Sequence, residues 1–199
     1  MESIAVIDFE TTGVSPDQAR ATEIGVAIIE GGQIVARYQS LMNSGAWVPP
    51  FIEQLTGISN AMLRAAPPSD QVMAEVADFI GERPLLAHNA AFDQKFWDAE
   101  LARIRRRRRQ PFACSLLLSR RLLPEAPSHK LGNLNRWAGL PDTGRAHRAL
   151  ADAEMAANLT LHLFDLLRRR HGRHQADHAL LCQLQKLSAA KVRALLAAG

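Results

Sequence analysis

Five residues, spread over three segments of the chain, have side chains that can bind divalent cations or move a proton. They are four carboxylates and one histidine, namely Asp8, Glu10, Asp93, Asp152 and His147. Carboxylate oxygens are the ligands that Mg²⁺ and Mn²⁺ prefer, and such a site needs no cysteine. An imidazole ordinarily titrates near neutrality and can accept a proton from water.

Asp8 and Glu10 follow a short β-branched, apolar run over residues 4–7, which predicts a buried strand. Side chains alternate between the two faces of a strand, so both carboxylates would project together while Phe9 points to the opposite face. Two neighbouring carboxylates repel each other unless a cation neutralises them. The alternative is a polar strand end that leads into a turn.

The other three candidates lie at expected element boundaries. Asp93 falls in the first turn of a predicted helix, where a carboxylate can simply be a favourable partner of the helix dipole. His147 and Asp152 are five residues apart, which corresponds to about 500° of helical rotation, so they do not share one helix face. We therefore expect His147 in the loop or at the cap before a long helix, and Asp152 one turn inside it. A surface position without function is the alternative for His147.

Taken together, the five residues suit the hydrolysis of phosphodiesters assisted by two divalent cations. One ion would lower the pKa of an attacking water, and the other would stabilise the leaving 3′ oxygen. The sequence therefore predicts two ions of Mg²⁺ or Mn²⁺ as cofactors and a nucleic acid as substrate.

Hydrophobic patterning predicts the elements that position these residues. Strands are expected over residues 4–7, 23–30, 34–39, 84–87 and 112–113, with a tight turn at residues 31–32. Helices are expected over residues 70–80, 91–105, 115–123, 130–138, 148–170, 178–187 and 189–197, with short helical turns over 49–68. This order is typical of an α/β fold with a mixed β-sheet flanked by helices. We expect one domain over residues 1–170 and a short helical C-terminal extension over residues 171–199.

Five short segments occur together in this chain: IDFETTG, LTGI, HNAAFD, KLGNL and HRALADA, at residues 7–13, 55–58, 88–93, 130–134 and 147–153. On these segments the sequence resembles the DEDDh 3′→5′ exonucleases, a family that includes the epsilon proofreading subunit of bacterial DNA polymerase III and RNase T. The similarity extends over residues 4–167. It implies a ribonuclease-H-like fold, in agreement with the mixed sheet expected above.

The resemblance also implies roles for the five candidates. Asp8, Glu10 and Asp152 would hold the first metal ion, with Asp8 shared with the second, and Asp93 would serve the second. His147 would be the general base. The implied reaction releases nucleoside 5′-monophosphates from the 3′ end of single-stranded DNA. Two alternatives stay open, an exoribonuclease that trims RNA 3′ ends and a proofreading or accessory subunit tethered to a polymerase.

Eight further residues are implied as substrate contacts, at the 3′ end, against the terminal base and along the strand path. These are Thr11, Thr12 and Val14, then Leu55, Thr56 and Ile58, and finally Asn89 and Phe92. Core packing is the alternative for Leu55, Ile58 and Phe92.

The chain carries a formal net charge of +4, and its most basic segment is the run of five arginines Arg105–Arg109. Such a run is expected to be exposed. It predicts a patch that contacts the phosphate backbone of the substrate. A solvated helix end, where cations are favourable, is the alternative.

The remaining sequence features concern location and partners. Two distant cysteines, Cys114 and Cys182, without a CxxC pattern, argue against zinc and favour a reducing cytoplasmic location. No apolar stretch approaches the roughly 20 residues of a membrane helix, so a membrane partner is not expected. Residues 175–199 match neither a polymerase-binding linker nor a clamp peptide, which favours a free-standing enzyme while polymerase or clamp association stays open.

Overall fold

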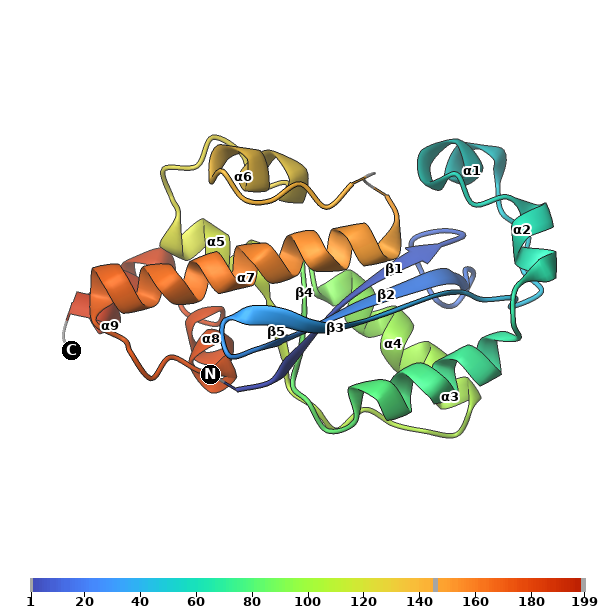
Figure 1. Ribbon diagram of the computed structural model, residues 1–199, viewed down its shortest axis with the longest axis horizontal. Coiled ribbons are helices and arrows are strands. Elements are labelled where there is room, and N and C mark those ends of the chain that lie inside the picture. The colour runs from blue at the N-terminus through green and yellow to red at the C-terminus, as the bar shows by residue number, and fades with distance from the viewer. Residues whose placement is uncertain (1, 145–146, 198–199) are drawn as a thin grey trace.

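The computed structural model describes residues 2–144 and 147–197. At its centre is a five-stranded sheet of order β3-β2-β1-β4-β5 (Figure 1). The strands are β1 (Ile4–Thr11), β2 (Ala21–Glu30), β3 (Gln33–Leu41), β4 (Leu85–Ala87) and β5 (Phe112–Cys114). The first three form an antiparallel meander, and β4 and β5 run parallel to β1. The predicted mixed sheet is therefore confirmed.

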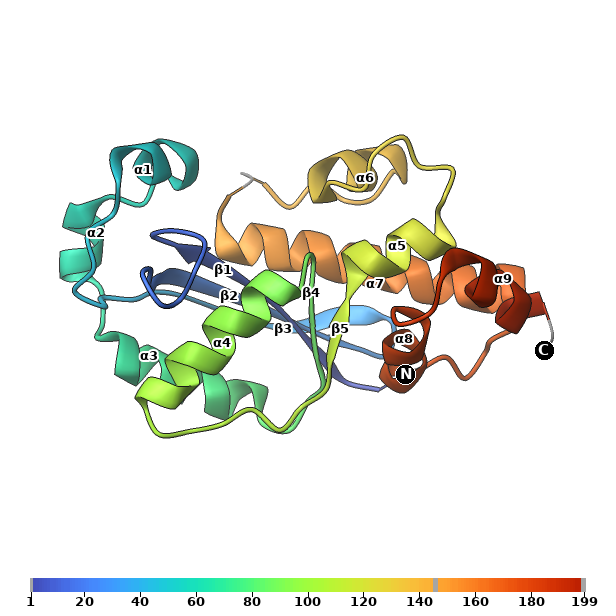
Figure 2. The same cartoon turned by 180° about the vertical axis from the view of Figure 1, so that it is seen from behind.

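Nine helices surround the sheet in the described part of the chain. They are α1 (Pro50–Thr56), α2 (Asn60–Ala65), α3 (Ser69–Ile80), α4 (Ala91–Arg103), α5 (Ser115–Leu122), α6 (Leu131–Trp137), α7 (Ala149–His171), α8 (His178–Leu184) and α9 (Ala189–Ala197). The long helix α7 crosses one face of the sheet, and α3 and α4 cover the other (Figures 1 and 2). Helices α1 and α2 stand beyond one end of the sheet, whereas α8 and α9 lie toward the opposite end (Figure 1).

The alternation of side chains along β1 divides the core into two layers. Ile4 and Val6 belong to the cluster under α7, while Ile7 and Phe9 belong to the cluster under α3 and α4. The strand is longer than the predicted run of residues 4–7 because its backbone pairing with β2 continues to Thr11. Both carboxylates of β1 therefore lie within a strand whose conformation is fixed by its neighbours.

The segment after α7 packs onto the sheet edge and onto the core layer beneath α7. The Gln185 side chain accepts a hydrogen bond from the backbone N–H of Cys114 at 2.7 Å and donates to the carbonyl of Phe112 at 3.0 Å. An edge strand exposes such unpaired backbone groups, and Gln185 satisfies two of them on β5. Leu181 and Leu184 are buried in the cluster under α7. A division of the chain at residue 170 stays a prediction.

No helix in the described ranges 2–144 and 147–197 is long and apolar enough to cross a membrane.

Candidate active site

The site lies where α7 begins, at the C-terminal half of β1 and the N-terminal half of β2. In the sheet Asp8 is opposite Gly25, and Glu10 is opposite Glu23. A Cβ atom at Gly25 would lie 2.2 Å from the carbonyl carbon of Ala149, so only glycine lets the first turn of α7 approach β2 this closely. This close approach brings Asp152 to the carboxylates of β1.

Three of the predicted residues converge at this point. One ligand atom each of Glu10, His147 and Asp152 lies within 4.8 Å of the others, and the three side chains form a candidate metal-binding group. His147 precedes α7 with φ 61°, in the left-handed region, and its side chain is exposed. Its backbone N–H donates to Asp152 Oδ2 at 3.0 Å. The predicted loop position of His147 and helical position of Asp152 are confirmed.

Asp93 reaches the same site from the other layer of the fold. It lies in the first turn of α4, is 2% exposed, and its Oδ1 accepts a hydrogen bond from the backbone N–H of Phe9 at 3.1 Å. The turn before α4 places Asn89 at φ 65°, a conformation in which asparagine is enriched. The hydrogen bond from Phe9, which lies between Asp8 and Glu10 in β1, thereby fixes the side chain of Asp93.

The four carboxylates disfavour one another's ionisation. Burial raises the pKa of Asp8 well above its usual range, and the negative charges of Asp93, Asp152 and Glu10 raise it further. Burial, with Asp152 and Glu23, raises the pKa of Glu10 to about 8, although nearby Arg148 opposes this. The pKa of Asp93 is raised to about 8, mainly by burial.

Burial likewise raises the pKa of Asp152. A cluster of carboxylates that resists ionisation in this way is stabilised when a divalent cation neutralises it. Oxygen ligands alone suit Mg²⁺, Mn²⁺ or Ca²⁺. The residues present therefore fit a divalent cation.

Glu23 is a residue of this site that the sequence analysis missed. It is completely buried, and it accepts hydrogen bonds from Arg148 Nε at 3.1 Å, Arg148 Nη2 at 2.7 Å and the backbone N–H of Ala149 at 3.0 Å. Glu23 thus anchors the start of α7, directly after His147. The only local signal is a charged residue directly before the apolar run of residues 24–29, and it does not indicate Arg148 as the partner.

The predicted substrate contacts at the end of β1 differ in their accessibility. Val14 is 85% exposed at the β1–β2 loop. Thr11 is buried, and its Oγ1 donates to the Gly13 carbonyl at 2.6 Å. Thr12 is half-buried, and its Oγ1 accepts from the backbone N–H of Arg20 at 3.0 Å. Their contact with the 3′ end stays a prediction.

The predicted contacts in and beside α1 and α4 also differ in their accessibility. Leu55 is 48% exposed, whereas Thr56 and Ile58 are buried, and Ile58 packs with Val48 and Leu63 in a small core of the α1–α2 region. Asn89 is exposed, and Phe92 is half-buried with its ring centroid 5.0 Å from that of Phe96. Leu55 and Asn89 are therefore accessible to a ligand. Ile58 is a core residue in this structure, as the core-packing alternative expects.

The arginine run Arg105–Arg109 begins after α4 ends, and two of its members are ion-paired. Arg106 Nη1 lies 2.6 Å from Asp78 Oδ1. Arg108 makes a bidentate pair with Asp98 at 2.8 and 3.0 Å and lies 5.8 Å from the centre of the Phe112 ring. Arg105, Arg107 and Arg109 are exposed and form no ion pair with any carboxylate in the described ranges. A phosphate-contacting role of the run stays a prediction.

The fold and the carboxylate cluster define a candidate hydrolase site that can hold divalent cations, and comparison with known proteins identifies its class. Residues 5–160 match the family model of the RNase T type described as "Exonuclease". The chain is 30% identical over 185 residues to the DNA polymerase III subunit epsilon of Aquifex aeolicus (strain VF5), covering 92% of this chain and 90% of that protein.

Two further similarities extend this result. The chain is 35% identical over 192 residues to the 3′-5′ exonuclease DinG of Bacillus subtilis (strain 168), covering 94% of this chain but only 20% of that protein. The solved structure of Exonuclease X in complex with 5′ overhanging duplex DNA has a TM-score of 0.73 at 22% identity, over 92% of this chain and 99% of that one. The protein belongs to the exonuclease family and is a 3′→5′ exonuclease of the DEDDh type.

Proposed function

We propose that this protein hydrolyses single-stranded DNA from the 3′ end and releases nucleoside 5′-monophosphates, using two divalent cations and His147 as general base. The observation that carries the proposal is the convergence of Glu10, His147 and Asp152 within 4.8 Å, beside two further carboxylates with raised pKa values. Such a site is suited to cleaving a polyanionic backbone once cations neutralise it.

The carboxylates have distinct parts in this proposal. Asp8, Glu10 and Asp152 would hold one Mg²⁺ or Mn²⁺ ion, and Asp8 and Asp93 would serve a second. When bound, such ions supply positive charge that activates a water and stabilises the leaving 3′ oxygen. Asp93 has little freedom to move, because the backbone N–H of Phe9 donates to it, so it is preorganised for its ligand.

His147 accepts the proton of the attacking water at a ring nitrogen. Its position supports this role, since it is exposed and lies before α7 rather than within it. The backbone hydrogen bond from His147 to Asp152 keeps the base beside a metal ligand, while the side chain can turn toward the substrate. A general base must lie within hydrogen-bond reach of the proton it takes, often only when substrate is bound.

One experiment tests the proposal. Single-stranded DNA, duplex DNA and RNA, each labelled at the 5′ end, are incubated with Mg²⁺, Mn²⁺ or EDTA and with the wild type or Asp8→Ala. The expected result is a ladder that shortens from the 3′ end, only with metal and only with the wild type. Cleavage in EDTA, or unchanged cleavage by Asp8→Ala, would contradict the proposal.

The cleavage assay and a co-purification experiment separate the alternatives. Faster digestion of RNA than of DNA would favour an exoribonuclease that trims 3′ ends. A polymerase-tethered subunit is favoured by the similarity to DNA polymerase III subunit epsilon along most of that protein's length. Co-purification of a polymerase with the tagged full chain would support that alternative, and its absence under low-salt conditions would favour a free-standing enzyme. A cytoplasmic location stays a prediction.

A further inference from the structure

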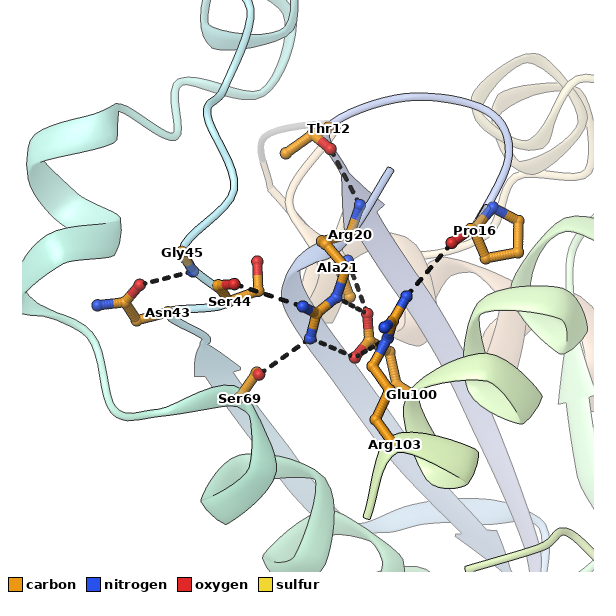
Figure 3. Close-up of polar contacts among 10 residues, drawn as sticks. All are labelled: Thr12, Pro16, Arg20, Ala21, Asn43, Ser44, Gly45, Ser69, Glu100 and Arg103. Atoms are coloured by element: carbon orange, nitrogen blue, oxygen red, sulfur yellow. Dashed lines mark hydrogen bonds and ion pairs between the residues drawn. The ribbon is translucent and has the colours of Figure 1, made fainter. Parts of the chain in front are cut away.

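A buried ion pair lies at the end of the β1–β2 loop, ten residues beyond the carboxylate Glu10 (Figure 3). Arg20 Nε and Nη2 donate to the two carboxylate oxygens of Glu100 at 2.8 and 2.9 Å. The Glu100 side chain is 3% exposed and that of Arg20 is 22% exposed. The backbone N–H of Ala21 donates to the same carboxylate at 3.3 Å. This pair has no part in the metal site described above.

The backbone of Arg20 closes the β1–β2 loop. The N–H of Thr12 donates to the carbonyl of Arg20 at 2.9 Å, and Thr12 Oγ1 accepts from the N–H of Arg20 at 3.0 Å. On the other side of the loop, Arg103 lies 3.6 Å from Glu100 and donates to the carbonyl of Pro16 at 3.4 Å. The loop that carries Thr12 is therefore held at both its base and its middle (Figure 3).

The guanidinium of Arg20 also binds the neck of the α1–α2 unit, which we define as residues 44–68. The chain leaves and returns through a paired neck, because the N–H of Asn43 donates to the carbonyl of Pro67 and the N–H of Ser69 donates to the carbonyl of Asn43. Arg20 Nη1 donates to the carbonyl of Ser44 at 3.3 Å, and Nη2 donates to Ser69 Oγ at 3.2 Å. One side chain thus contacts both sides of the neck.

The α1–α2 unit depends on this neck for its orientation. It has a small core of its own, made by Val48, Ile58 and Leu63, and the unit stands beyond the end of the sheet (Figure 1). A unit with so small a core is held in place mainly by the chain segments that join it to the rest of the molecule.

A buried ion pair is a costly way to gain stability, because the loss of hydration offsets most of the attraction. Its distinctive contribution is directional, since a bidentate arginine–carboxylate pair fixes the angle between the segments it joins. We propose that Arg20 and Glu100 are positioning residues that set the α1–α2 unit against the β1–β2 loop, and thereby align the two segments that are predicted to contact the terminal nucleotide. This inference rests on the proposed function.

The test uses the full chain with Glu100→Gln and Arg20→Lys. Asp98→Asn is the matched control, because it removes another bidentate arginine pair from the same helix. Asp98 lies two residues before Glu100, about 200° around the helix from it, and its partner Arg108 is outside the β1–β2 loop. For a single-stranded oligonucleotide, both test variants should raise KM about tenfold and keep kcat within about twofold, since substrate positioning is lost while the reacting groups stay. Asp98→Asn should leave KM unchanged.

The lysine variant separates geometry from charge. Lysine keeps the charge beside Glu100 but cannot also reach Ser44 and Ser69, so Arg20→Lys should raise KM as much as Glu100→Gln does. Full rescue by lysine would overturn the proposal, because then only charge compensation would matter.

Amide hydrogen exchange gives a second readout that does not need activity. Glu100→Gln should speed exchange about tenfold in residues 12–20 and 43–69 and leave α6 and α8 unchanged. If Glu100→Gln does not fold, Arg20→Lys and Ser69→Ala are measured in the same way. Unchanged exchange in these segments in a folded variant would overturn the inference, whereas a wild type that degrades no nucleic acid would overturn only the proposed function.

Discussion

Two sets of buried or half-buried carboxylates lie at the same end of this fold and are compensated in opposite ways. Glu23 and Glu100 each receive a bidentate arginine and a backbone N–H. The site carboxylates form no ion pair with arginine or lysine in the described ranges; they are Asp8, Glu10, Asp93 and Asp152. Instead, their pKa values are raised.

The difference predicts which carboxylates serve the fold and which serve a ligand. Removal of a carboxylate that is paired with an arginine destabilises the fold, because the arginine is left buried and unpaired. Removal of a carboxylate that lies among other carboxylates should instead stabilise the metal-free fold, since it relieves the repulsion between like charges. We therefore expect the crowded carboxylates to lower the stability of the metal-free protein, and a bound cation to restore it.

The largest expected effect comes from Asp8→Asn, which removes one charge from the crowded set without changing side-chain volume. We expect kcat to fall about a thousandfold or more, because the carboxylate that is proposed to serve both ions is lost. In EDTA the same variant should melt at a higher temperature than the wild type. Steady-state kinetics and thermal melting measure the two effects. A lower melting temperature in EDTA would break the comparison, because Asp8 would then stabilise the metal-free fold.

Glu23→Gln tests the arginine-paired set. We expect the free energy of unfolding to fall by about 3 kcal/mol, because Arg148 loses its carboxylate partner while Gln keeps the shape. Activity should fall as well, since Glu23 holds the start of α7 beside His147. Urea denaturation gives the stability change, and Arg148→Gln with the double variant completes a mutant cycle. Additive losses in the cycle would show that the pair is not coupled.

The pH dependence of stability sharpens the same contrast. Glu10 and Asp93 have pKa values of about 8 in the folded protein, above their ordinary values, so the folded state binds more protons than the unfolded state between these limits. The stability they contribute is complete below pH 4 and is lost as the pH rises through 8. We expect the metal-free protein to lose stability progressively between pH 5 and pH 8.

Excess Mg²⁺ provides the control for this titration. It should raise the melting temperature more at pH 8 than at pH 5, because the cation competes with protons for the same oxygens. A metal-free protein that gains stability between pH 5 and pH 8 would contradict the assignment of these carboxylates to a repulsive cluster.

Several of these features could be predicted from the sequence because they depend on local geometry. Alternation along a strand placed Asp8 and Glu10 on one face, and the five-residue spacing of His147 and Asp152 excluded a shared helix face. The predicted first strand was too short, because polar residues interrupt its apolar run after residue 7. Pairing with β2 extends the strand to Thr11, and no local pattern encodes that pairing.

The roles of Glu23 and Gly25 could not be predicted locally. Glu23 is 125 residues from Arg148, its partner, and the need for glycine at position 25 arises only when α7 is packed against β2. Both roles depend on tertiary contacts. The same holds for the arginine run, which is uniform in sequence but divided in the structure, because the path of the chain after α4 decides which side chains meet a carboxylate.

The smallest expected effect concerns this division of Arg105–Arg109. Gln at positions 105, 107 and 109 should weaken binding of single-stranded DNA a fewfold at low salt and reduce the salt slope of log Kd by about 0.7 for each phosphate that is no longer neutralised. The melting temperature should stay unchanged, because these exposed side chains form no ion pair in the described ranges.

Gln at positions 106 and 108 should do the opposite. It should lower the melting temperature by removing the pairs with Asp78 and Asp98, while the salt slope stays the same. Equal salt slopes for the wild type and both variants would exclude a phosphate-binding role for the run. Only the structural ion pairs of Arg106 and Arg108 would then remain as its function.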